Sequence, residues 1–222
     1  MLFTDKTWKD LTGYGLFWSL VAIAATAFVI EAVREIAARA PGDVEASRAP
    51  WLALHALVAL PILIIAPLQF NPWIRRAKPL AHRWLGRAFL SLALVVAASA
   101  IVLGATVEYT GSRVPLVLFG VVWMGVAIAA WTCARQGDFL AHRAFAIRTF
   151  AIAFAFVWVR LLRELEAPLL GFMESAEMRA MTREWLSFVV PLLIVEIWLS
   201  WAPAIRNAYA RSRKQRPSSL ST

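Results

Sequence analysis

Cysteine and histidine are scarce in this chain. Its 222 residues contain one cysteine, Cys133, and three histidines, His55, His82 and His142. A single cysteine excludes an internal disulfide, and we expect a reduced, buried thiol at the inner end of a membrane helix. The sequence also lacks a glycine-rich phosphate loop and any ferredoxin or flavin motif. Any chemistry performed by the chain therefore depends on few side chains.

Acidic residues are also few. Aspartate and glutamate number 14 against 23 lysines and arginines, which gives a formal net charge of +9. The basic residues are spread over several segments and form no single basic face, as a nucleic-acid-binding surface would require. The composition therefore disfavours nucleic acid as a partner.

Long polar stretches are rare, and apolar residues dominate instead. They make up 60% of the chain, the mean hydropathy is +0.64, and they occur in runs of about 20, enough to cross a hydrocarbon layer of about 30 Å as helix. This predicts an all-α integral membrane protein whose partner is the lipid bilayer. Six helical spans are expected, at residues 11–33, 51–70, 82–107, 114–134, 143–165 and 184–204.

Charge predicts the orientation. With a cytoplasmic N-terminus, the inner segments hold three acids and 15 of the 23 basic residues: Lys6, Lys9, Arg75, Arg76, Lys78, Arg83, Arg87, Arg135, Arg143, Arg148, Arg206, Arg211, Arg213, Lys214 and Arg216. This asymmetry obeys the positive-inside rule and places both termini in the cytoplasm. Residues 1–205 are predicted to form one six-helix domain, residues 206–222 a disordered basic tail, and residues 172–183 a short helix on the outer surface.

The tetrapeptide Leu-Ala-His-Arg occurs twice, at residues 80–83 and 140–143. Each copy lies at the inner start of a predicted span, so spans two and three, and four and five, form equivalent hairpins. Both hairpins run in the same direction, which predicts two parallel repeats in a four-helix core, unless the recurrence is a coincidence. The repeat would bring His82 and His142 to the same depth on opposite sides of this core.

Two facing histidines can be the axial ligands of a haem. Small residues lie one turn after each, Gly86 after His82 and Ala146 after His142, and could leave room for a porphyrin. Guanidinium groups bind carboxylates bidentately, so the haem propionates could be neutralised by nearby arginines: Arg83, Arg87, Arg143 and Arg148. The simpler alternative is that each His-Arg pair is a charged anchor at the membrane boundary, and that Gly86 only lets helices approach closely.

Other polar residues lie within the apolar spans. Glu196 is deep in the last span, where a carboxylate needs a partner or a watery cavity, and it could relay a proton or be a packing residue. His55 and Arg160 lie about one turn from the outer surface, and for His55 a hydrogen bond is favoured over a metal. We predict one inner site formed by side chains of three helices: Gln69, His82, Arg87, His142 and Arg148.

Four motifs follow one another in order along the chain: Pro-Leu-Gln-Phe ending at Phe70, His82-Arg83-x-x-Gly86-Arg87, Gly137-Asp138-x-x-x-His142-Arg143-x-Phe145-x-Ile147-Arg148, and Arg160. This ordered set resembles a bacterial membrane-protein family known as domain of unknown function 2306. The resemblance spans residues 55–165 and implies a multi-pass protein of the bacterial inner membrane, without indicating an activity. The chain departs from the family pattern at Phe145-Ala146, where the family has Trp-Met.

A looser resemblance is to b561-type dihaem membrane cytochromes, which share a haem between histidines of two helices near one surface. It implies that His82 and His142 bind one haem b. A second haem would need another histidine to pair with His55, and the predicted span 114–134 contains none. Electrons would then come from a quinone pool or a redox partner. Two alternatives remain open: a small transporter or lipid-handling protein, and a non-catalytic subunit or assembly factor of a larger membrane complex.

Overall fold

A computed structural model describes residues 47–214 and seven isolated positions before them, 15, 16, 19, 23, 26, 30 and 34. The described part is helical, with these elements: α2 (Ala49–Phe70), α3 (Pro72–Ala77), α4 (Pro79–Ala105), α5 (Thr110–Gln136), α6 (Phe139–Ala153), α7 (Ala155–Glu164), α8 (Glu166–Leu170), α9 (Ala176–Glu196), a π-helical turn η2 (Ile197–Trp201) and α10 (Ala202–Lys214). The predicted span 11–33 lies outside the described residues except for isolated positions.

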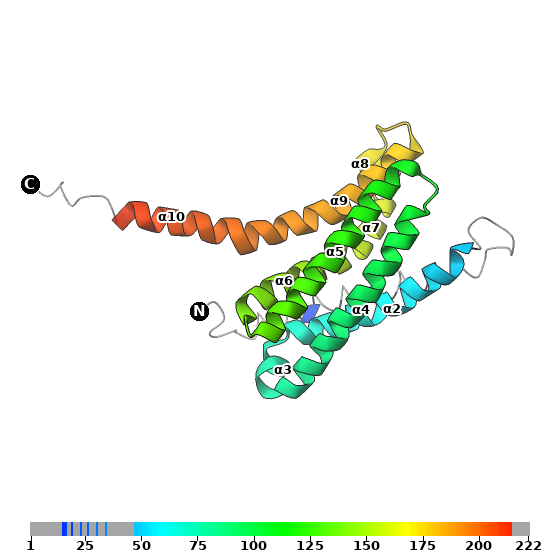
Figure 1. Ribbon diagram of the computed structural model, residues 1–222. Helices are drawn as coiled ribbons and strands as arrows, with labels where there is room; N and C mark the ends of the chain where they lie inside the picture. Colours follow the sequence, from blue (N-terminus) through cyan, green and yellow to red (C-terminus); the bar gives the residue numbers. More distant parts are fainter. Residues whose placement is uncertain are drawn as a thin grey trace, which may run out of the picture.

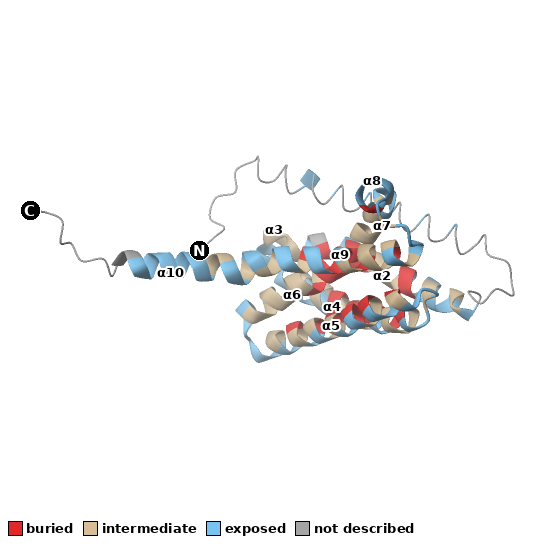
Figure 2. Ribbon diagram, turned by 90° about the horizontal axis from the view of Figure 1, so that it is seen from above, coloured by how far each residue is buried: buried red, intermediate tan, exposed pale blue. Residues whose placement is uncertain are grey.

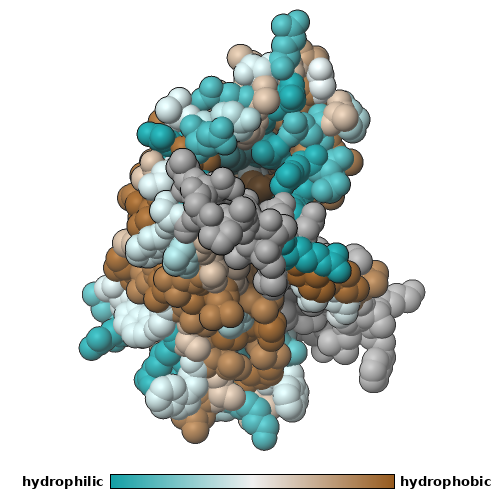
Figure 3. Space-filling view, turned by 90° about the vertical axis from the view of Figure 1, so that its right-hand side faces the viewer, coloured by the Kyte–Doolittle hydropathy of each residue, from teal (hydrophilic) through white to brown (hydrophobic). Residues whose placement is uncertain are grey.

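Among the described residues, five helical segments are long and apolar enough to cross a membrane: Ala49–Phe70, Pro79–Ala105, Thr110–Gln136, Phe139–Glu164 and Ala176–Ser212. They coincide with the last five predicted spans, so the chain is a multi-span membrane protein. The fourth of these helices is interrupted at Phe154, where α6 ends and α7 begins. Figure 3 shows hydrophobic residues across the middle of one face, with hydrophilic residues gathered above them.

Local sequence signals determine where several helices begin and end. Pro79 occupies the first turn of α4, where a missing backbone N–H costs no helical hydrogen bond. Asp138 caps α6, because its carboxylate accepts a hydrogen bond from the Ala141 N–H at 3.0 Å. Gly137 ends α5 with a φ of 80°, a left-handed conformation that glycine adopts without strain. Ser175 caps α9 by accepting from the Met178 N–H at 3.3 Å.

Four helices form a closed ring. α4 packs against α2 and α5, α5 packs against α6, and α6 contacts α2, so that α4 and α6 lie across the ring from each other. In Figure 1, α4 and α5 run side by side over their whole length. Buried residues gather where these helices face one another (Figure 2), and many are alanines with no exposed surface: Ala66, Ala93, Ala97, Ala127 and Ala130. Such small residues let membrane helices pack closely.

The last membrane helix differs from the prediction. Residues 172–183 do not form a separate surface helix, because α9 begins at Ala176 and continues without a break to Glu196. The Ser175 cap starts the helix eight residues before the predicted boundary at Glu184, and α9 then packs against α5, α6 and α7. The predicted disordered tail from residue 206 is helical as far as Lys214. Residues 215–222 lie outside the described part.

Candidate functional site

The two copies of Leu-Ala-His-Arg occupy the same place in two helices. α4 begins at Pro79 and α6 at Phe139, so the tetrapeptide fills the second to fifth positions of each helix. We call the end of the ring where α4 and α6 begin the histidine end. His82 and His142 are half-buried there. The structure thus places the two predicted histidines at the same end of the bundle, at equivalent positions of α4 and α6.

The His142 ring is oriented by the neighbouring helix. Its Nδ1 lies 2.8 Å from the Ala130 carbonyl oxygen of α5. Because a carbonyl can only accept, Nδ1 must donate, and in the neutral ring the lone pair then lies on Nε2. A backbone carbonyl bound to the second nitrogen is a common way of fixing a metal-ligating histidine. His142 is therefore held in the tautomer that leaves Nε2 able to bind a ligand.

The His82 ring is held less firmly. Its Nδ1 is buried, and no residue of the described part forms a hydrogen bond with it. The backbone carbonyl of His82 instead accepts a hydrogen bond from Gln69 Nε2 at 3.1 Å. An unpaired buried nitrogen costs free energy that a bound group could recover.

Gln69 also covers Gly86. A Cβ atom built on Gly86 would lie only 3.0 Å from Gln69 Oε1. The space beside Gly86 is therefore occupied by the amide of α2, and the predicted room for a porphyrin does not lie on this side of α4. Gly86 lets the Gln69 side chain approach the backbone of α4. This agrees with the alternative prediction that Gly86 only allows a close approach between helices.

The predicted propionate ligands are not all at this site. Arg83, Arg87 and Arg143 are exposed near the histidine end, and the Arg87 guanidinium carbon lies 4.9 Å from the centre of the Trp84 ring. Arg148, by contrast, faces the last helix. The predicted inner cluster thus contains Gln69, His82 and His142, with Arg87 at its edge and Arg148 elsewhere.

Arg148 and Glu196 form a bidentate ion pair between α6 and α9. Nε of Arg148 lies 2.5 Å from Oε1, and Nη2 lies 3.0 Å from Oε2. Ser200 Oγ donates to Oε2 at 3.0 Å. Arg148 is nine residues after the start of α6, about 14 Å along the helix. Glu196 thus has the partner that its depth in the membrane requires, and both its oxygens are occupied.

His55 belongs to a different contact. It is buried on α2, and its Nδ1 lies 2.9 Å from Ser99 Oγ of α4. Ser99 Oγ donates its only hydrogen to the Val96 carbonyl at 2.8 Å, so the histidine is the donor to Ser99. His55 therefore joins α2 to α4. Arg160 is half-buried on α7.

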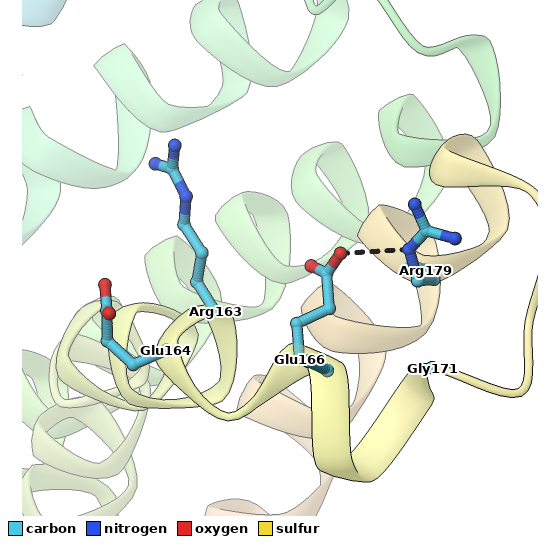
Figure 4. Close-up of a pocket in the computed structure, with 6 residues that line it drawn as sticks. Arg163, Glu164, Glu166, Gly171 and Arg179 are labelled. Carbon is cyan, nitrogen blue, oxygen red and sulfur yellow. Dashed lines mark hydrogen bonds and ion pairs between the residues drawn. The ribbon is translucent and has the colours of Figure 1, made fainter.

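The opposite end, where α9 begins, carries an ion-pair cluster that the sequence analysis did not single out. Glu166 of α8 accepts hydrogen bonds from Arg179 Nε at 3.0 Å and from Arg183 Nη1. Arg179 also donates to the carbonyls of Met173 and Glu174, at 2.6 and 2.9 Å. In Figure 4, Glu166 points toward Arg179 across a cleft of about 510 Å³. Arg179 and Arg183 are four residues apart and therefore lie on one face of a helix. This spacing was the signal for the cluster that the sequence contained.

Two further carboxylates of α9 face α5. Glu177 Oε1 accepts from the Gly111 N–H at 2.9 Å and from Thr110 Oγ1 at 3.3 Å, so it caps the first turn of α5. Glu184 is buried near Ser112. Sequence analysis placed Glu184 at the membrane boundary because the helix start at Ala176 was not recognised.

The described residues contain no group of three or more histidine, cysteine, aspartate or glutamate side chains able to hold a metal ion. A haem iron, by comparison, needs only two protein ligands. Cys133 is half-buried on α5 rather than fully buried.

Comparison with known proteins identifies a family. No curated protein and no solved structure matches the chain. A family model described as predicted membrane protein DUF2306 matches residues 52–199, which include the histidine end and the Arg148–Glu196 pair. Since this match covers well over half of the 222 residues, the chain belongs to the DUF2306 family of predicted membrane proteins.

Proposed function

We propose that this membrane protein binds one b-type haem at the histidine end, between His82 of α4 and His142 of α6, and transfers electrons. The single observation that carries the proposal is the equivalent placement of His82 and His142 at the starts of α4 and α6. They hold equivalent positions on helices that face each other across the ring, and His142 is fixed with Nε2 available. A haem bound in a four-helix bundle needs two imidazoles from facing helices.

The orphaned nitrogen of His82 supports the same proposal. Its buried Nδ1 has no partner in the described part of the chain, so a ligand bound by this nitrogen would compensate the free-energy cost of leaving it unpaired. Bound haem would supply one-electron chemistry, and the chain would supply the two imidazoles and the surrounding basic charge. Electrons would come from a quinol or a protein partner, because the sequence has no second redox motif.

The structure changes the roles proposed for three of the neighbouring residues. Gln69 covers Gly86, so we assign Gly86 to helix packing. Arg148 is paired with Glu196, so we propose Arg83 and Arg87, which are exposed near the histidine end, as the residues that neutralise propionates. Both Glu196 oxygens accept hydrogen bonds, so we propose a structural role for this carboxylate in place of a proton relay. By the positive-inside rule, we further propose that the histidine end faces the cytoplasm of a bacterial inner membrane.

The absorption spectrum of the purified protein tests the proposal. We expect a Soret band and a sharp reduced α-band from the protein made in haem-replete cells. His82→Ala and His142→Ala should each abolish or grossly change both bands, whereas His55→Gln should leave them unchanged. The third histidine is the matched control, because its ring binds Ser99 and lies outside the pair.

Two results would reject the haem. One is a colourless wild-type protein that does not bind added haemin. The other is a haem spectrum that survives both alanine substitutions. In either case the transporter and the non-catalytic subunit become the working hypotheses.

A further inference from the structure

The last membrane helix is much longer than a bilayer requires. The continuous helical segment Ala176–Ser212 has 37 residues, about 55 Å at 1.5 Å per residue, against a hydrocarbon thickness of about 30 Å. The 21 residues of α9 alone are long enough to span it. Most of α10 must therefore lie beyond the hydrocarbon core or run along its surface.

Figure 1 shows α10 leaving the bundle instead of continuing beside it. The change follows the π-helical turn η2, and α10 contacts η2. Residues 204–212 are all exposed. π-helical turns inside α-helices often mark functional positions, and they are among the recognised causes of helix kinks.

The depth of α10 can be judged from the Arg148–Glu196 pair. Arg148 follows the first residue of α6 by nine positions. A helix that runs from Glu196 toward the histidine end would need about nine residues to reach the level of Phe139, the first residue of α6. It would therefore reach that level near Ile205. The basic residues of α10 follow at this level: Arg206, Arg211, Arg213 and Lys214. They lie where lipid headgroups would be.

Apolar side chains follow one side of the same segment. Trp198, Trp201, Ile205 and Tyr209 are spaced by three or four residues and are 51%, 53%, 55% and 73% exposed. We call these four residues the aromatic stripe. Tryptophan and tyrosine favour the membrane–water interface, because the ring is apolar and carries one polar group. No acidic residue occurs in Ala202–Lys214, so the helix has a single sign of charge.

We propose that α10 is an interfacial helix that binds the headgroups of anionic lipids at the histidine end. The aromatic stripe would lie toward the acyl chains, and Arg206 and Arg211 would contact lipid phosphates. Basic charge beside an apolar face is the chemistry that binds an anionic membrane surface. This inference is independent of the haem proposal, because none of its residues belongs to the histidine pair.

Spin labels on opposite faces of α10 provide the test. In a Cys133→Ser background, Tyr209→Cys places a label on the stripe, and Asn207→Cys places the control label about 200° around the helix. The full-length protein is reconstituted into vesicles of phosphatidylcholine alone or with one-quarter phosphatidylglycerol. Collision of each label with oxygen and with a water-soluble nickel chelate is then measured.

With phosphatidylglycerol, we expect the Tyr209 position to collide mainly with oxygen and the Asn207 position mainly with the nickel chelate. The difference should shrink at least twofold in phosphatidylcholine alone, and also when Arg206 and Arg211 are replaced by glutamine. Equal nickel accessibility at both positions would overturn the proposal, because α10 would then project into water. If the Tyr209 label is shielded from the nickel chelate and its spectrum is broadened by a second label nearby, a second copy of the chain covers the stripe. That result would also overturn the proposal. A difference independent of lipid charge would reject headgroup recognition.

Discussion

The two ends of the helix bundle use polar side chains differently. At the opposite end, Glu166 binds two arginines, Arg179 also holds two backbone carbonyls, and Glu177 caps α5. At the histidine end, the buried Nδ1 of His82 has no hydrogen-bond partner in the described part, and the His142 ring is held through Nδ1. The opposite end also keeps one buried nitrogen without a hydrogen-bond partner in the described part, Arg183 Nε. Its carboxylates are shared between helices and stabilise helix connections, whereas imidazole nitrogens with remaining capacity can bind something else.

The same comparison explains why we do not assign the function to the cleft beside Glu166. The cleft beside Glu166 is lined by charged residues, including Arg163, Glu164 and Arg179. Glu166 and Arg179 already neutralise each other across it, so a charged ligand would have to replace existing ion pairs. The histidine end requires no such exchange at His82.

The largest expected effect comes from removing the charge of Glu166. Glu166→Gln leaves the Arg179 and Arg183 guanidinium groups without their shared carboxylate, at a site where these side chains are only 17–26% exposed. We expect a loss of about 2 kcal/mol, because partly buried charged hydrogen bonds are lost without replacement. This corresponds to about 4–8 °C in the unfolding temperature in detergent.

Glu174→Gln is the matched control for this substitution. Glu174 is exposed and contributes its backbone carbonyl to Arg179, so the change should cost less than about 0.5 kcal/mol. Equal effects of the two substitutions would show that the ion-pair cluster does not stabilise the opposite end. Both variants should retain the spectrum expected of the histidine pair.

An intermediate effect is expected where Gln69 covers Gly86. Alanine normally favours a helix over glycine by about 1 kcal/mol, and a Cβ at Gly125 would meet nothing within 4 Å. At Gly86 the added methyl group lies 3.0 Å from Gln69 Oε1, and overpacking costs about 1 kcal/mol or more. Gly86→Ala should therefore be less stable than Gly125→Ala by about 1 kcal/mol in chemical or thermal unfolding.

Replacing Gln69 separates packing from helix propensity. In a Gln69→Ala background the clash partner is absent, so Gly86→Ala and Gly125→Ala should change stability by similar amounts. A gap that persists in this background would mean that Gly86 is required for another reason, such as room for a ligand. That outcome would restore the role that the sequence alone suggested for it.

The smallest effects concern the helix caps at the two ends. Asp138→Ala removes a 3.0 Å cap from α6, and Ser175→Ala removes a 3.3 Å cap from α9. We expect a loss of about 1 kcal/mol for the first and about 0.5 kcal/mol for the second, while Asp138→Asn should be nearly neutral. Because the Asp138 carboxylate caps the helical turn that carries His142, only Asp138→Ala should also shift the bands expected of the proposed haem. Equal shifts from Ser175→Ala would contradict the assignment of the site to the histidine end.

Much of the architecture could be predicted because a bilayer restricts the choices of the chain. Apolar runs long enough to span it must be helical, since lipid offers no partners for backbone groups. The last five spans were therefore located, and the proline and glycine signals at Pro79 and Gly137 agree with observed helix ends. The start of α9 was missed, because charged residues such as Glu184 looked like a boundary while their partners on other helices were unknown.

What the sequence by itself determined is the class of the protein, the positions of most helices and the equivalence of the two His-Arg motifs along their helices. Only the tertiary structure decided which polar groups meet. Arg148 binds Glu196 across 48 residues of sequence, and the Gln69 side chain of α2 lies against Gly86 of α4. The physical reason is that apolar patterning determines which segments enter the membrane. The neighbour and the rotation of each helix depend instead on close packing between small residues such as Ala93 and Ala130.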